Sequence, residues 1–521
     1  MKLSLNETFN KELPADPILK NSRRQVEKAC FSYATPKKTK KPEIIHVSPE
    51  VTALLGIEKE DVVSQEFTNI FTGNKVLENT KPFAMCYGGH QFGNWAGQLG
   101  DGRAINLTEV IHNKQQWAIQ LKGAGPTPYS RTADGLAVLR SSVREYLCSE
   151  AMYHLGIPTT RALSLALTGE EVLRDVLYDG NPAYEKGAIV CRVAPSFLRF
   201  GNYEIFAARN DVKNLKILVD YTVKNHFPHL GSPSRETYLA FFKEVAAKTL
   251  ETIVHWQRVG FVHGVMNTDN LSISGLTIDY GPYGWLEGYD PNWTPNTTDR
   301  QYKRYRYENQ PNIGLWNLLQ LANALYPLIE EAAPLEATLD TYKSTFEQRA
   351  LEMHKSKLGL EKSGTTDREL FDKLEETLQL TETDMTLFFR KLSSLSKTDN
   401  PKEAMLLIQD AFYKPKELTE GVIQKWETWF SSYLKRLKKE TNTDTERKEK
   451  MNAVNPKYVL RNYMAQLAID AAEKGDYSLI DELFVLLKNP YDEQTDAEKW
   501  FAKRPEWARH KVGCSMLSCS S

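Results

Sequence analysis

The chain has 521 residues, a formal net charge of -1, 41% hydrophobic residues and 26% charged residues. This balance is typical of a folded globular protein, and it excludes the strong positive field that proteins use to bind nucleic acid or anionic membranes. No apolar run reaches the roughly 18 residues that a membrane helix requires, and the N-terminus resembles neither a secretory signal nor an Arg-rich presequence, so we expect a cytoplasmic protein.

The first 80 residues are mixed in character, and we interpret them as an N-terminal extension. They contain a Lys-rich loop at 36–43 and a short helix near 48–57. From Phe83 the residue pattern changes, because "YGGHQFGNWAGQLGDGRA" at 87–104 places many glycines between short β-prone segments. The segment "WAIQLK" at 117–122 then predicts a strand that runs into a second glycine-rich loop.

A helix is predicted over residues 136–155. Its apolar residues recur at three- and four-residue spacing, and Gly156 and Pro158 end it. Strands resume around "AIVCRVA" at 188–194. The order of glycine loop, Lys-bearing strand, helix and strands predicts that residues 81–200 form the small nucleotide-binding lobe of a kinase-like fold.

After residue 201 the pattern becomes helical, and a long amphipathic helix at 238–260 leads into the segment "HGVMNTDNLSISGLTIDYG" at 263–281. We therefore expect an α+β, two-lobed, protein-kinase-like fold. Residues 201–335 would form the large lobe with the metal and catalytic loop, and residues 336–521 a helical C-terminal extension.

A buried polyphosphate requires backbone amides, cations and a bridging metal ion. Gly100, Gly102 and Arg103 supply a glycine turn with a cation, and Lys122 ends a strand where a kinase lysine grips phosphates. A glutamate on the following helix normally orients such a lysine. Glu145 and Glu150 both qualify, and Glu145 is better centred.

The 263–281 segment carries the strongest signal. Asn270 and Asp279 could converge on one magnesium ion, with the apolar "LTID" predicted as a strand between them. Kinase-like enzymes that begin this loop with His-Gly-Asp use the Asp as a base, but here Val265 follows His263-Gly264. Because general-base help is typically worth about 10²–10⁴ in rate, Val265 argues against ordinary phosphotransfer. Asp269 is either a relocated base or a turn residue.

Four of the six cysteines lie singly among mostly apolar neighbours, as reduced core thiols do. Cys514 and Cys519 lie instead in the Ser-rich tail "GCSMLSCSS". We hypothesise that this tail is redox-sensitive.

Three stretches together closely resemble the selenoprotein O family: residues 87–104, 120–152 and 262–286. This family consists of kinase-fold proteins, once classed as pseudokinases, that act as protein adenylyltransferases. The likeness runs through at least residues 83–292 and reappears at the C-terminus. Family members usually end in Cys-Ser-Cys-Ser-Ser, whereas Cys514 and Cys519 are five residues apart here, so pairing of the two thiols is in doubt.

The resemblance implies that ATP lies reversed relative to a kinase, with its γ-phosphate buried and its α-phosphate presented to a Ser, Thr or Tyr hydroxyl of a protein. It implies Mg²⁺ or Mn²⁺ as the metal and UTP as a further nucleotide. From the composition and charge we expect no nucleic-acid or membrane partner. Carried over by motif, the proton acceptor is Asp269 and the metal ligands are Asn270 and Asp279. The expected nucleotide-site residues are Gly100, Gly102, Arg103, Lys122, Asp134, Gly135, Glu145, Arg192, Arg199 and Asp279.

Two rivals to adenylyl transfer follow from the residues. One is a kinase-like phosphotransferase, which Val265 disfavours, and the other is a non-catalytic ATP-binding scaffold, which Asn270 and Asp279 disfavour.

Overall fold

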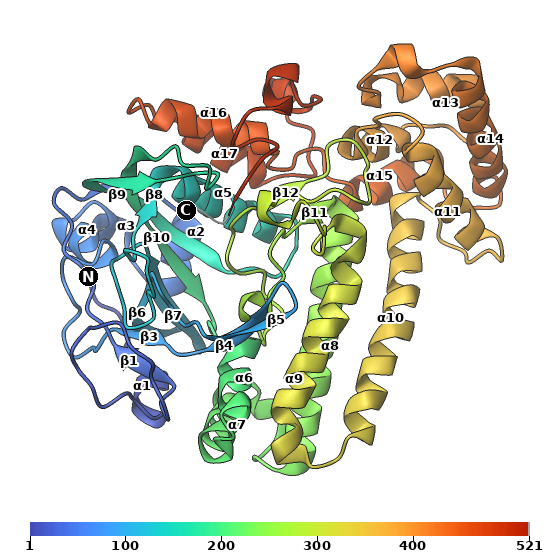
Figure 1. Ribbon diagram of the computed structural model, residues 1–521. Helices are drawn as coiled ribbons and strands as arrows, with labels where there is room; N and C mark the ends of the chain where they lie inside the picture. Colours follow the sequence, from blue (N-terminus) through green and yellow to red (C-terminus); the bar gives the residue numbers. More distant parts are fainter. Residues whose placement is uncertain (519–521) are drawn as a thin grey trace.

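An antiparallel sheet dominates the first 200 residues, and helices form most of the remainder (Figure 1). The computed structural model describes residues 1–518, which form a mixed α+β fold. The main sheet has eight strands in the order β1-β3-β6-β7-β10-β9-β2, with β8 paired to β10. Its strands are β1 Phe31–Tyr33, β2 Glu43–Val47, β3 Phe83–Met85, β6 Ala104–His112, β7 Gln115–Lys122, β8 Ala137–Val138, β9 Arg161–Arg174 and β10 Ala183–Ala194.

The two faces of this sheet have different characters. Gln120 of β7 lies opposite Arg192 of β10, and Lys122 follows two residues later. Because alternate residues of a strand point to opposite sides, these three polar side chains share one face, and all three are buried. The intervening Leu121 and Cys191 lie on the other face, in an apolar core shared with helices α2 (Pro49–Leu55) and α4 (Gln65–Phe71). The sheet therefore offers a buried polar face to the rest of the molecule.

The predicted N-terminal extension contributes two strands to this sheet. β1 pairs with β3 at one edge, and β2 pairs with β9 at the other. Helix α2 starts after Ser48, whose hydroxyl caps Val51 N, and it ends at Gly56 in the left-handed conformation (φ 68°). Residues 31–55 are thus an integral part of the sheet and its apolar core.

In the part of the chain that the structure describes, two short strand pairs lie outside the main sheet. β4 (Gly88–Gln91) and β5 (Asn94–Gln98) form a hairpin whose turn places Phe92 (φ 50°) and Gly93 (φ 86°) in the left-handed region. β11 (Phe261–Val262) pairs with β12 (Gly284–Trp285). This second pair closes the loop that contains residues 263–283.

The helix predicted at 136–155 begins later than expected. α5 spans Leu139–His154, whereas Ala137 and Val138 form strand β8 opposite Ala188 and Gly187. The helical spacing of apolar residues extends back to Leu136, but pairing with β10 fixes the backbone at 137–138 in an extended conformation. The predicted strand at 188–194 is confirmed and is longer, as β10.

Helices account for most of the chain after residue 200. The long α8, α9 and α10 lie side by side (Figure 1), and α16 and α17 pack on α5. The helices are α1 Phe9–Glu12, α2 Pro49–Leu55, α3 Lys59–Val62, α4 Gln65–Phe71, α5 Leu139–His154, α6 Phe200–Ala208, α7 Val212–His226, α8 Arg235–Val259, α9 Gln310–Ile329, α10 Ala333–Lys357, α11 Asp367–Leu378, α12 Met385–Leu392, α13 Pro401–Leu407, α14 Glu420–Leu437, α15 Asp444–Val454, α16 Asn462–Ala472 and α17 Ser478–Leu487. Within residues 1–518, none of the helices has the length and apolar character needed to span a membrane.

The strand predicted for "LTID" at 276–279 is wrong. Only Thr277 forms a bridge, to Thr159, and no continuous ladder follows. Positive φ values at Gly275 (68°) and Asp279 (56°) bend the chain on either side, so the segment is too short to pair further. Trp256 of α8 donates from Nε1 to Thr277 Oγ1 at 3.0 Å and fixes the segment instead.

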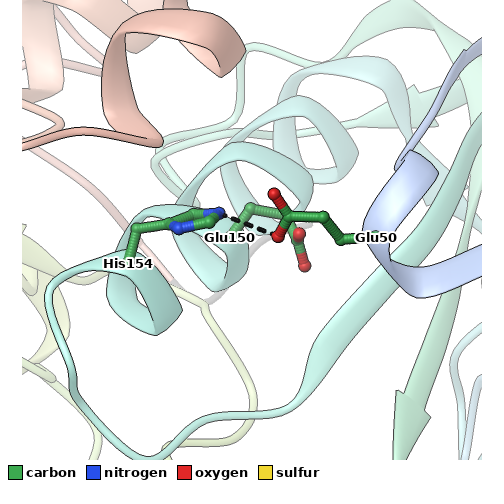
Figure 2. Close-up of side chains that lie close together, drawn as sticks. All are labelled: Glu50, Glu150 and His154. Carbon is green, nitrogen blue, oxygen red and sulfur yellow. Dashed lines mark ion pairs between the residues drawn. The ribbon is translucent and has the colours of Figure 1, made fainter. Parts of the chain in front are cut away.

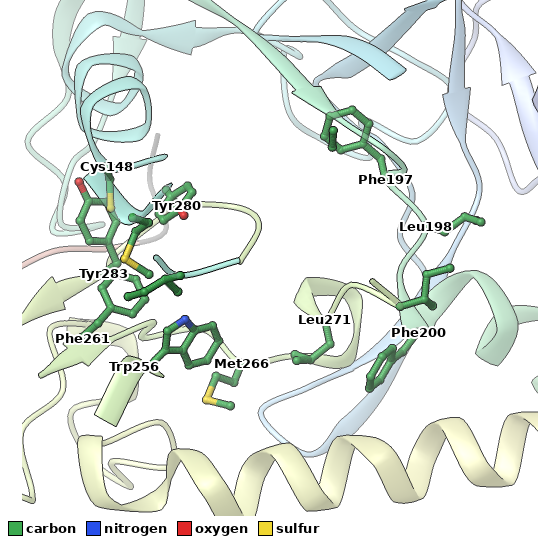
Figure 3. Close-up of a cluster of buried hydrophobic side chains, with 14 of the residues drawn as sticks. Cys148, Phe197, Leu198, Phe200, Trp256, Phe261, Met266, Leu271, Tyr280 and Tyr283 are labelled. Atoms are coloured by element: carbon green, nitrogen blue, oxygen red, sulfur yellow. The ribbon is translucent and has the colours of Figure 1, made fainter. Parts of the chain in front are cut away.

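A cluster of buried, largely aromatic side chains packs against this loop (Figure 3). Phe261 packs against Tyr283 with ring centroids 5.8 Å apart and against Trp256 at 5.7 Å. Because dense aromatic packing leaves little room for movement, this cluster holds residues 263–283 rigidly against α8.

Candidate active-site cleft

A cavity of about 870 Å³ separates the polar face of the sheet from the 263–282 loop. Every residue that the sequence predicted for the nucleotide and metal site lines it except Glu145, which lies behind Lys122. The glycine turn 100–102 forms part of the wall. At Gly100 (φ 85°) any side chain would overlap the Tyr129 ring, so both conformation and space require glycine.

Buried charged side chains form a continuous row of ion pairs across the cavity floor. Lys122 Nζ lies 2.5 Å from Glu145 Oε2, and Arg192 pairs with the other oxygen of Glu145. Arg192 Nη2 also reaches Asp279 Oδ1 at 2.7 Å. Of the two glutamates that the sequence left open, Glu145 is therefore the partner of Lys122, whereas Glu150 pairs with Arg161.

Arg199 extends this row of ion pairs to the 263–281 loop. Its guanidinium pairs with Asp279, donates to the Asp269 carbonyl at 2.8 Å and stacks 4.8 Å from the Tyr87 ring centroid. Asp101 Oδ1 lies 3.9 Å away. Arg199 is only 3% exposed, so these contacts fix a cation at the junction of sheet and loop.

Asp279 has a left-handed backbone, which aspartate tolerates, and a strongly stabilised charge. Its φ of 56° is uncommon for a residue other than glycine, asparagine or aspartate. Burial would raise the pKa of Asp279, but Arg199, Arg192 and Lys122 outweigh it and hold the pKa well below its usual range. The carboxylate is therefore ionised throughout the physiological pH range.

The environment of Lys122 disfavours its charged form, whereas that of Asp279 favours the charged form. Burial lowers the pKa of Lys122 to about 8, although Glu145 opposes the shift. The amine therefore keeps its proton at neutral pH by a small margin.

Asp269 is the second carboxylate of the loop, and its environment differs from that of Asp279. Burial raises its pKa to about 7, although Arg199 and a hydrogen bond from Gln91 oppose the shift. Gln91 Nε2 donates to Oδ2 at 3.4 Å, while the buried Oδ1 has no hydrogen-bond partner among the described residues. Such a carboxyl group exchanges a proton readily near neutral pH.

The side chains around Asn270 and Val265 define the remaining loop geometry. Asn270 Nδ2 donates to the Val265 carbonyl at 3.0 Å, which leaves the amide oxygen as its ligand atom. His263 contacts the Ile278 carbonyl through Nε2 at 2.9 Å and is buried, so it is structural. Asn270 and Asp279 thus present two hard oxygen donors to one cavity, a donor set that fits Mg²⁺ or Mn²⁺.

Asp134 is exposed at the rim of the cavity, whereas Gly135 beside it is buried. The guanidinium of Arg174 on β9 donates two hydrogen bonds of 2.8 Å to the Asp134 carboxylate. Gly135 has φ 77°, and a side chain there would overlap the Gly125 backbone. Asp134 is therefore engaged by Arg174, and the backbone at 134–135 forms part of the cavity wall.

Sequence reasoning missed the hairpin β4–β5. His90 N donates to Thr268 Oγ1 at 2.7 Å, and Phe92 N donates to Asn267 Oδ1 at 3.2 Å. With Gln91 on Asp269, three consecutive hairpin residues bind three consecutive loop residues. The glycines at 88, 89 and 93 were the available signal, because a side chain at Gly89 would lie 2.9 Å from Asp269 Oδ1.

A second group of metal-type ligands lies away from the cleft (Figure 2). Ligand atoms of Glu50, Glu150 and His154 lie within 4.8 Å of one another. Arg161 contacts Glu150 at 2.6 Å and Glu50 at 3.2 Å, and Lys488 contacts Glu50 at 2.7 Å. These cations neutralise the carboxylates, so the group is an ion-pair network.

The C-terminal tail packs beside the cleft. Leu517 forms a bridge to Asn296, and Thr297 N donates to the Leu517 carbonyl at 2.8 Å. Cys514 is buried, and burial raises the pKa of its thiol to about 11, which disfavours the reactive thiolate. Cys519 lies outside the described residues, so the redox-sensitive tail stays a prediction.

Comparison with known proteins gives consistent matches along the chain. The family described as "Protein adenylyltransferase SelO" matches residues 19–488. A Flavobacterium johnsoniae protein named "Protein nucleotidyltransferase YdiU" is 64% identical over 519 residues, covering 100% of this chain and 99% of the relative. Proteins of the same name from Rhodopirellula baltica and Aromatoleum aromaticum are 56% and 53% identical over 536 and 524 residues, each covering 100% of this chain and 99% of the relative.

Proposed function

The chain belongs to the SelO family of protein adenylyltransferases, and from this membership we propose how its cleft transfers a nucleotide. The protein is a protein nucleotidyltransferase. In our proposal it binds ATP in reverse within a kinase-like, two-lobed fold. It then transfers AMP to a Ser, Thr or Tyr hydroxyl of a protein.

The observation that carries the reversed orientation is the burial of cations at the cavity floor. Lys122, Arg192 and Arg199 are 5%, 3% and 3% exposed. The terminal phosphate is the most highly charged part of ATP, and an unpaired buried charge is very costly. A floor with several cations, two of them arginines whose planar forks match phosphate oxygens, favours that end of the nucleotide.

The reaction then takes place at the α-phosphorus, beside the loop. Asp269 accepts the proton of the acceptor hydroxyl as its oxygen forms a bond to the α-phosphorus. The bond from that phosphorus to the oxygen bridging to the β-phosphate breaks, and pyrophosphate leaves with the bonding electrons. Val265 lies where a kinase would place its base, and the base moves to Asp269 because the reacting phosphorus has moved.

Asn270 and Asp279 are the residues that would hold a magnesium or manganese ion. When bound, the ion neutralises charge on the phosphates. Asp279 also contacts Arg192 and Arg199. A bound polyphosphate would therefore compete with Asp279 for both guanidinium groups, and the Asp279 carboxylate would then be available to hold the metal ion.

The remaining assignments complete the site. Gly100, Gly102 and Arg103 would contact the phosphates from the glycine turn, and the Asp134–Gly135 backbone would contact the nucleotide at the rim. UTP would serve as a second nucleotide. The five described cysteines are buried and none forms a disulfide with another, which is consistent with the proposed cytoplasmic location.

Labelled ATP distinguishes this proposal from its rivals. The protein is incubated with Mg²⁺ and ATP labelled on either the α- or the γ-phosphate, and label is followed into protein. Adenylyl transfer predicts incorporation of the α-label alone. Incorporation of the γ-label would instead indicate a phosphotransferase, and incorporation of neither label would indicate a scaffold.

A further inference from the structure

A cluster of aromatic and basic side chains lies on the hairpin side of the cleft. We call it the aromatic platform, and it consists of His90, Phe92, Trp95, Arg304, Tyr305 and Trp316. His90 contacts Trp95 and Trp316 with ring centroids 5.2 and 5.4 Å apart, and Phe92 contacts Tyr305 at 5.3 Å. Trp95 is 40% exposed, so the platform reaches the surface.

Arg304 is the cation of this platform, and its guanidinium is held by rings. Cζ lies 4.7 Å from the Trp316 ring centroid and 5.8 Å from that of Tyr305. On the hairpin side it lies against Gly93, where an added Cβ would approach Cζ to 3.2 Å. The guanidinium is therefore fixed in position before any ligand arrives.

No acidic side chain of residues 1–518 forms an ion pair with Arg304, and its Nε and Nη2 are buried without a hydrogen-bond partner. The neighbouring carboxylates are engaged elsewhere. Asp299 accepts the backbone N–H groups of Arg304 and Tyr305 at 2.9 and 2.7 Å, and Glu204 contacts His90 at 2.6 Å. The residue as a whole is partly exposed, so its guanidinium can meet an anionic group from outside the chain through its remaining terminal nitrogen.

The platform adjoins the nucleotide cavity, because Phe92 lines that cavity as well, whereas Arg304 lies outside it. Tyr305 OH donates to Asn267 Oδ1 at 2.6 Å, and Phe92 N donates to the same oxygen. Asn267 lines the cavity two residues before Asp269, whereas Arg304 is not among the lining residues. A polypeptide that places a hydroxyl near Asp269 would therefore extend across Arg304.

We propose that the aromatic platform binds the acceptor protein and that Arg304 pairs with an acidic side chain close to the modified hydroxyl. This inference rests on the proposed function. Exposed Arg300 and Lys303 on the same segment add positive charge, so the surface complements an acidic polypeptide. Tryptophan, tyrosine and arginine are the side chains that most often dominate protein-binding surfaces, and a fixed guanidinium forms a strong charge-assisted hydrogen bond to a carboxylate.

Two synthetic peptides test the proposal, each with one serine, flanked either by glutamates or by lysines. Wild-type protein should show the lower KM for the acidic peptide. Arg304→Gln should raise that KM about tenfold or more, because it removes one member of a charge pair, with kcat and the KM for ATP little changed. Arg304→Glu should reverse the preference toward the lysine peptide. Arg235→Gln, which changes an exposed arginine at the start of α8 outside the platform, is the matched control and should leave the KM for the acidic peptide unchanged.

Equal KM values for the two peptides with wild-type protein, or use of neither peptide, would overturn the proposal. An unchanged acidic-peptide KM in Arg304→Gln would also overturn it. So would a fall in kcat for both peptides together with a lower melting temperature, because that pattern marks a structural arginine. The proposed function is tested separately, since its failure would leave wild-type protein with no α-label in any protein, itself included.

Discussion

Asp279 combines a left-handed backbone with contacts to two arginines, so a substitution there tests both conformation and charge. We predict that Asp279→Ala abolishes transfer of the α-label, by more than about a hundredfold, and weakens nucleotide binding in the presence of Mg²⁺. Asp279→Asn is the matched control for the backbone, because asparagine tolerates positive φ, and it should also be inactive. Calorimetry with ATP measures the binding. Full activity in either variant would refute the role of the carboxylate.

Lys122 gives a pH prediction. Its pKa in the free protein is lowered to about 8 by burial, so the charge that attracts phosphate is present below pH 8 and is lost as pH rises through that value. ATP affinity should therefore decline above pH 8, by at most about tenfold per pH unit. Lys122→Arg keeps its charge to much higher pH and should show a flatter profile. A wild-type affinity that stays constant from pH 7 to 9.5 would contradict this assignment.

At the scale of single residues, the sequence predicted which residues belong to the site better than it predicted which residues contact one another. It placed Lys122, Arg192, Arg199 and Asp279 in one site, and the structure brings them together. Spacing left both Glu145 and Glu150 open and favoured Glu145, which the structure pairs with Lys122 and Arg192, whereas Glu150 pairs with Arg161. It also missed Arg174 as the partner of Asp134, because that contact joins residues 40 positions apart.

Among the elements, the hairpin β4–β5 holds the loop that carries Asp269. Gln91→Ala removes the side chain that contacts the Asp269 carboxylate. We predict a lower kcat for AMP transfer with little change in the affinity for ATP, because the orientation of the acceptor's base changes and the phosphate contacts remain. Gln91→Glu should be at least as impaired, since it loses the donor and adds a like charge.

Asn94→Ala, on the exposed part of the same hairpin, is the control and should retain activity. Equal kcat values for Gln91→Ala and Asn94→Ala would show that the hairpin does not orient Asp269.

The ion-pair network in Figure 2 joins α2, α5 and β9 to the end of α17. Arg161→Ala would leave the buried Glu150 carboxylate without its cation, and breaking such a buried pair typically costs about 3–5 kcal/mol. We expect a clear fall in the melting temperature. Lys488→Ala removes a more exposed cation and should cost less than about 1 kcal/mol. Equal melting temperatures for the two variants would contradict a structural role for Arg161.

Element boundaries were predicted less well than element types. The helix containing Glu145 begins at Leu139 because β8 takes up the two preceding residues, and "LTID" is bent by positive φ at both ends. Neither effect is local, since each depends on a partner strand or a packed loop. Periodicity reports which side of an element is apolar, and it cannot report where pairing with a distant strand begins.

At the scale of the whole molecule, the site is assembled from segments far apart in the chain. The polar face of the sheet supplies Lys122 and Arg192, the 263–281 loop supplies Asp269 and Asp279, and the aromatic cluster in Figure 3 holds that loop in place. The sequence predicted the α+β class and the helical C-terminal region. It did not predict that residues 31–33 and 43–47 would form the two edge strands of the main sheet.

The most direct test of the account is a structure of the protein with Mg²⁺ and a non-hydrolysable ATP analogue. We predict the γ-phosphate on the cavity floor, in contact with Lys122 and Arg192, and the α-phosphate beside Asp269. An adenine ring on that floor, with the γ-phosphate toward the opening, would contradict the reversed orientation on which the proposed reaction depends.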